Sequence, residues 1–136
     1  MSVPVIRRRV LLAYLVGAGV AGTVLVGPYA VRRLVESVLT PLRAAPVLPF
    51  FTLPVVWGAW NVAWAVRRPC PPIGAWGAAL GGALGCAVNI YIWWAGAWFG
   101  GALLLPPFLL VVYYLIWRLV IGPLNEALGV DGDEPR

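Results

Sequence analysis

The sequence contains no histidine and no lysine, and it has few acidic residues. Without histidine, the chain cannot hold a haem through an imidazole, bind zinc through histidine, or relay protons through an imidazole. The five acidic residues all lie outside the long apolar stretches, at Glu36, Glu126, Asp131, Asp133 and Glu134. Paired carboxylates for general acid and base chemistry are therefore missing from those stretches. We expect the protein to bind no metal and no other cofactor.

Cysteine is also scarce, and Cys70 and Cys86 do not form a C-x-x-C pair. If Cys70 lies in a loop and Cys86 lies on the helix that follows, about 20 Å separates them at 1.5 Å per residue. That separation is too large for a disulfide. Cys86 has no neighbouring cation or histidine to stabilise a thiolate, so we interpret it as a small packing residue. These absences together predict that the protein is not an enzyme.

Charge is low and apolar content is high. The chain has 136 residues, of which 62% are hydrophobic and 11% are charged, and its mean hydropathy is +0.88. Soluble domains usually have about 45–50% apolar and about 25% charged residues. Because the apolar residues fall in blocks long enough to cross a bilayer, the sequence predicts an all-α integral membrane protein whose first partner is the lipid bilayer.

Four apolar stretches predict a four-helix transmembrane bundle within a single domain over residues 1–130. The predicted spans are residues 10–30, 47–66, 73–92 and 102–121. Between the first two spans, residues 31–43 place apolar side chains at helical spacing with polar ones opposite, which predicts an amphipathic helix in the membrane interface. Residues 131–136 form a short polar tail.

Prolines define the limits of the last span. Pro106-Pro107 indicates either a kink within it or a later start of its regular part, and we favour the kink because the shorter helix would not cross the bilayer. Gly122-Pro123 predicts its end.

The first span permits a second interpretation. Arg7-Arg8-Arg9 followed by an apolar run resembles a signal peptide, and the paired arginines resemble a twin-arginine signal. No clear small-x-small cleavage site follows, so a first transmembrane helix is the preferred interpretation.

The net charge of +5 comes entirely from arginine. A basic protein can bind nucleic acid, but here most arginines lie at the edges of apolar blocks, where membrane proteins keep the charges that set their topology. Those assigned to topology are Arg7, Arg8, Arg9, Arg67 and Arg68. They predict a multi-pass protein with both termini in the cytoplasm and no nucleic-acid partner. Arginine without lysine, together with much alanine, glycine, proline and tryptophan, suggests a GC-rich bacterial genome and hence the bacterial inner membrane.

Gly77, Gly81 and Gly85 recur at every fourth position of a chargeless stretch. On a helix they form one face that is nearly bare of side chains, where a second helix can approach closely. Gly17 belongs to a similar small-residue face in the first span. We assign these four glycines to helix packing.

The second span carries an aromatic ridge, Trp57, Trp60 and Trp64, with Asn61 beside it. The ridge is either a wall around a hydrophobic or cationic ligand, or bulky packing with Trp64 as an interface anchor. Asn61 and Asn89 are either two stations on a solute path or two unrelated helix contacts.

Three functions remain open at this point, and the least favoured of them is a lipid-modifying or redox enzyme, because the apolar stretches lack acids, bases and metal ligands. The first is a structural or accessory membrane protein that packs with itself, as a homo-oligomer, or with a larger membrane complex, through its glycine face and its tryptophan ridge. The second is a small oligomeric channel or carrier for an anionic or lipophilic solute, which would gather the two asparagines and small residues around a shared cavity.

Overall fold

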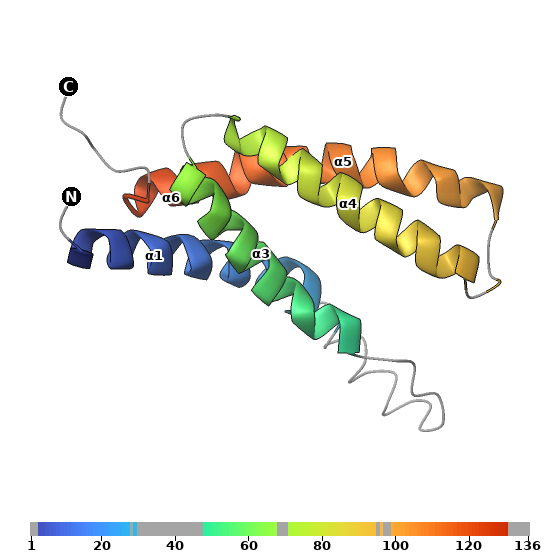
Figure 1. Ribbon diagram of the computed structural model, residues 1–136, viewed down its shortest axis with the longest axis horizontal. Helices are drawn as coiled ribbons and strands as arrows, with labels where there is room; N and C mark the ends of the chain where they lie inside the picture. Colours follow the sequence, from blue (N-terminus) through green and yellow to red (C-terminus); the bar gives the residue numbers. More distant parts are fainter. Residues whose placement is uncertain are drawn as a thin grey trace. The chain divides into compact units, whose positions relative to one another are not determined.

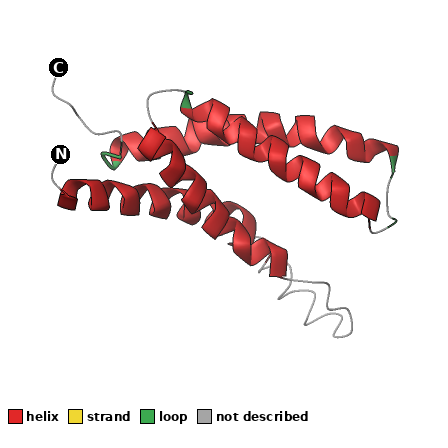
Figure 2. Ribbon diagram, viewed as in Figure 1, coloured by secondary structure: helices red, strands yellow, loops and turns green. Residues whose placement is uncertain are grey.

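A computed structural model describes residues 3–27, 29, 48–67, 71–94, 96 and 99–130. All the regular elements in these ranges are helical, and no strand occurs among them (Figure 2). The predicted amphipathic segment 31–43, Arg68, Cys70 and the tail 131–136 lie outside the described residues. The all-α prediction is confirmed for the part of the chain that is described.

The described elements fall into two compact units. The first contains α1, Val3–Ala21, which continues into a π-helical turn, Gly22–Val26, and α3, Leu48–Arg67, except for its last residue, Arg67, which belongs to the second unit. The second contains α4, Ile73–Trp94, and a longer helical run that includes α5 (Figure 1). The proposal of a single domain over residues 1–130 remains a prediction.

Helix α1 begins earlier than the predicted span, at Val3 rather than at residue 10. Arginine is a good helix former, so the helix continues through Arg7-Arg8-Arg9 instead of starting after them. Helix α3 keeps Pro54 in its interior. A proline there removes one helical hydrogen bond, which a helix tolerates when its other contacts are sufficient.

Two helices of the described residues, Ile73–Trp94 and Gly100–Ala127, are long and apolar enough to cross a membrane. The second is a composite of four segments: a 3₁₀ turn Gly100–Leu104, α5 Leu105–Ile116, a π-helical turn Trp117–Ile121 and α6 Gly122–Ala127.

The predicted end of the last span at Gly122-Pro123 is wrong, because the helix continues to Ala127. Pro123 has no N–H to donate within this continuous helix, and the π-helical turn just before α6 is the kind of local adjustment that accommodates a proline. At the other end, Pro106 and Pro107 lie in the first turn of α5. The 3₁₀ turn Gly100–Leu104 precedes them and extends the composite helix beyond the 12 residues of α5.

Helices α4 and α5 form a hairpin whose contact surface is glycine (Figure 1). A Cβ added to Gly77 would meet Trp117 Cβ and the Tyr113 carbonyl oxygen, both at 2.5 Å. One added to Gly81 would meet the Leu109 carbonyl oxygen, and one added to Gly85 would lie 2.6 Å from Pro106 Cα. Real Cβ atoms essentially never come this close to a neighbour, so the helices can pack at this distance only because these positions carry no side chain.

The chain's own α5 therefore covers the Gly77–Gly81–Gly85 face. The accessory interpretation assigns this face to a partner chain. In this arrangement α5 occupies the face, so a partner chain cannot also pack there. A partner would have to use the opposite, outward surface of the hairpin.

The turn after α4 is fixed by Gly96, whose φ of +70° lies in the left-handed region. Its N–H donates to the Trp93 carbonyl oxygen at 3.1 Å. Trp93 and Trp94 at the end of α4 are exposed.

Candidate functional site

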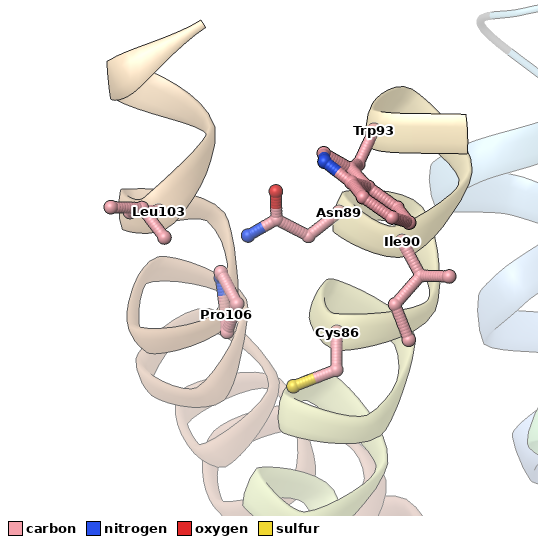
Figure 3. A pocket seen from close by; sticks show the side chains of 6 residues that line it. All are labelled: Cys86, Asn89, Ile90, Trp93, Leu103 and Pro106. Atoms are coloured by element: carbon pink, nitrogen blue, oxygen red, sulfur yellow. The ribbon is translucent and has the colours of Figure 1, made fainter. Parts of the chain in front are cut away.

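A pocket of about 350 Å³ lies at the end of the α4–α5 hairpin that is nearest its connecting turn. Its lining is almost entirely apolar, and it comes from both sides of the hairpin (Figure 3). The lining residues are Cys86, Asn89, Ile90, Trp93, Leu103 and Pro106. Cys86, Asn89, Ile90 and Trp93 fall at i, i+3, i+4 and i+7, so they form one face of α4.

Asn89 is the polar centre of this pocket. Its carboxamide extends from α4 toward Leu103 and Pro106, and the Cys86 sulfur points to the same side one turn away (Figure 3). Within the described part of the chain, Asn89 Oδ1 is buried and accepts no hydrogen bond. Pro106 has no N–H, so the facing turn lacks a donor at that residue. A buried oxygen without a donor costs about 1–3 kcal/mol, which makes this pocket a candidate site for a molecule that carries an O–H or N–H.

Asn61 is placed differently, in the contact between α1 and α3. It is fully buried, and its Nδ2 donates to the Ala13 carbonyl oxygen at 2.8 Å. Nearby, Gly17 lies against the Trp57 carbonyl, and Gly58 lies against the Tyr14 ring. Asn61 therefore acts as a helix-packing contact, one of the two roles the sequence allowed. Asn61 and Asn89 lie in separate units.

The tryptophan ridge of α3 is mostly buried. Trp57 is 0% exposed and Trp64 is 6% exposed, and Trp60 is half-buried. An interface anchor exposes its ring to lipid headgroups, so the burial of Trp64 favours packing. Trp60 lies on the same helix face but is less enclosed.

The arginines assigned to topology have different surroundings. Arg7 and Arg8 are exposed, and Arg9 is half-buried. The guanidinium carbon of Arg67 lies 5.9 Å from the ring centroid of Trp76, at cation–π distance.

Two features of these sites could not be found in the sequence. The pocket around Asn89 needs Leu103 and Pro106 opposite α4, and only the register of the hairpin brings them there. An apolar groove beside Arg7, between α1 and α3, likewise combines residues about fifty positions apart. In each site, the sequence shows only that the lining residues from one helix recur at helical spacing.

Over the described residues, the fold and the pocket define an all-helical arrangement with two helices long and apolar enough to cross a membrane and a small apolar site at one end of their hairpin. The chain matches no protein-family model, no curated protein and no solved structure.

Proposed function

We propose that the protein is a small multi-pass integral membrane protein of four spans, with both termini in the cytoplasm. In this proposal it acts as a non-enzymatic structural or accessory component of a bacterial inner membrane. It packs with copies of itself or with a larger membrane complex.

One observation carries the proposal, namely the distribution of large and small side chains in the α4–α5 hairpin. Four of the five buried residues of α4 are glycines: Gly74, Gly77, Gly81 and Gly85. On α5 and the turn after it, large apolar side chains are exposed, among them Phe108, Val111, Leu115 and Leu119. In the most apolar 18-residue stretch of each helix, only 33% of the residues are buried for Ile73–Trp94 and only 17% for Gly100–Ala127. A core helix in water would bury its large side chains, whereas hydrocarbon imposes no such cost on exposing them.

The outward stripe Phe108, Val111, Leu115 and Leu119 is the surface we assign to a neighbouring chain or to lipid. The residues follow helical spacing along one side of the helix. A partner helix could pack on this stripe without disturbing the glycine contact between α4 and α5.

Cysteine cross-linking in native membranes tests the accessory role. The chain has no lysine, so amine-reactive reagents are unsuitable, and Leu115→Cys with Cys70→Ser and Cys86→Ser supplies one outward thiol. We expect a bifunctional maleimide to give a ladder of self-multiples or one heavier species of constant mass. Leu80→Cys in the same background is the matched control, since Leu80 is 4% exposed and faces inward. A Leu115→Cys chain that stays as monomeric as this control would contradict the proposal.

A second candidate is a carrier for a lipophilic solute, and the Asn89 pocket favours it. The unpaired Asn89 Oδ1 is an acceptor, so a ligand that carries a hydroxyl or N–H group can supply the missing hydrogen bond. The apolar lining suits the rest of such a molecule.

The carrier role predicts that a long-chain alcohol protects the Cys86 thiol, which lines the pocket. In a Cys70→Ser background in detergent, 1-dodecanol should slow maleimide labelling of Cys86 more than dodecane does, because only the alcohol can donate to Asn89. Asn89→Leu should remove the difference between the two compounds. Equal protection by both compounds in the parent chain would exclude a hydroxyl-selective site.

A further inference from the structure

A second pocket, of about 590 Å³, lies between α1 and α3 in the first unit. We call it the α1–α3 groove. It is lined by Ile6, Arg7, Val10, Leu11, Tyr14, Ala59 and Val62. Four of the five lining residues of α1, Arg7, Val10, Leu11 and Tyr14, recur at i, i+3, i+4 and i+7. Together with Ile6 they form one stripe that extends about 12 Å at 1.5 Å per residue. Its volume is in the range of sites that hold small ligands.

One end of the groove is strongly cationic. Arg7 lines it, and Arg8 and Arg9 follow in the sequence. Neither α1 nor α3 contains an acidic residue. The cationic end of the groove therefore has no acidic side chain from its own two helices to neutralise it.

The rest of the groove is apolar. The contacts of Gly17 with Trp57, of Tyr14 with Gly58 and of Ala13 with Asn61 show that α1 and α3 are antiparallel. From Arg7 the groove passes Val10 and Leu11 and reaches Tyr14, with Ala59 and Val62 on the facing helix. A ligand that fits it must therefore join an anionic group at one end to an apolar chain at the other.

We infer that the α1–α3 groove binds an anionic phospholipid. The phosphate lies against the guanidinium group of Arg7, and one acyl chain follows the apolar stripe between α1 and α3. This inference rests on the proposed membrane location, which would place the arginines at the level of the lipid headgroups. Arginine is suited to this role because its planar guanidinium can bind two phosphate oxygens at once.

The test is lipid binding to the purified full-length chain in a non-ionic detergent. Phosphatidylglycerol should raise the thermal unfolding midpoint at lower concentration than phosphatidylcholine does. We expect Arg7→Gln to weaken the apparent affinity for phosphatidylglycerol about tenfold or more, through loss of a charge-assisted bond.

Two further variants isolate the site. Arg8→Gln is the matched control, because it removes the same charge from a residue that does not line the groove. It should weaken binding by no more than about fivefold, the general effect of one basic residue near the lipid. Ala59→Trp keeps every charge and fills the groove, so it should abolish the preference for phosphatidylglycerol.

Equal losses in Arg7→Gln and Arg8→Gln, or undiminished binding in Ala59→Trp, would overturn the inference. Stabilisation by inorganic phosphate equal to that by phosphatidylglycerol would also overturn it, since it would show a site for a free anion. Alkaline extraction of membranes, performed in parallel, separates this inference from the proposed function. A chain that stays in the membrane but shows no lipid preference overturns only the lipid site, whereas a chain that is released overturns both.

Discussion

Gly81→Leu is expected to destroy the packing of α4 on α5. A Cβ at position 81 would meet the Leu109 carbonyl oxygen and would lie 2.7 Å from Tyr113 Cβ. Much of the obstruction is helix backbone, which cannot rotate away as a side-chain end can. Overpacking a tight contact costs about 1–3 kcal/mol and occasionally more, and leucine adds three carbons beyond the Cβ. We expect a loss of about 3 kcal/mol or more, measured by thermal unfolding in detergent.

The neighbouring glycine provides a matched control. A Cβ at Gly82 would have as its nearest neighbour only Leu110 Cδ1, at 3.8 Å, which is ordinary van der Waals contact. Alanine is a better helix former than glycine by about 1 kcal/mol. Gly82→Ala should therefore leave stability unchanged or raise it slightly, while Gly81→Ala lowers it. Equal responses of the two alanine variants would show that close approach at Gly81 does not hold the hairpin together.

Val111→Asp is expected to prevent stable insertion of the hairpin. Val111 is 54% exposed on α5, near the middle of the helical run Gly100–Ala127. An aspartate at the centre of a transmembrane helix costs about 2.5–3.5 kcal/mol in insertion assays. That cost corresponds to a decrease of roughly 60- to 300-fold in the insertion equilibrium. The measurement is the carbonate-resistant fraction after synthesis in the presence of membrane vesicles.

The same substitution would have almost no effect on a water-exposed helix. Exposed positions away from special contacts usually tolerate substitution within about 0.5 kcal/mol. Leu124→Asp, on α6 near the end of the run, is the control, because the cost of a charge falls sharply toward the membrane surface. Similar insertion of the two variants and the parent chain would mean that hydrocarbon does not surround α5 at Val111.

The sequence predicted the helices better than their contacts. The spacing of Gly77, Gly81 and Gly85 indicated a bare helix face, because a four-residue repeat is a local property of one helix. It could not indicate that α5 of the same chain covers that face. The sequence placed a helix end at Gly122-Pro123, and the structure has a π-helical turn there followed by α6. The effect of a proline depends on the turn that precedes it, which local spacing does not specify.

The candidate sites depend on register between helices, and register is not a local property. Asn61 was recognisable as a polar residue in need of a partner, but nothing in its surrounding sequence identified the Ala13 carbonyl. Asn89 was recognisable in the same way, and the sequence could not indicate that its carboxamide would extend toward Leu103 and Pro106 (Figure 3). The sequence did not predict the groove beside Arg7, because a role in membrane topology already accounts for the arginines.

The central claim is that hydrocarbon surrounds the α4–α5 hairpin. Alkaline extraction of native membranes tests this claim directly. We predict that the intact chain stays with the bilayer after a carbonate wash and that only detergent releases it as a folded species. Recovery of folded, monodisperse protein in detergent-free buffer after the wash would contradict the account.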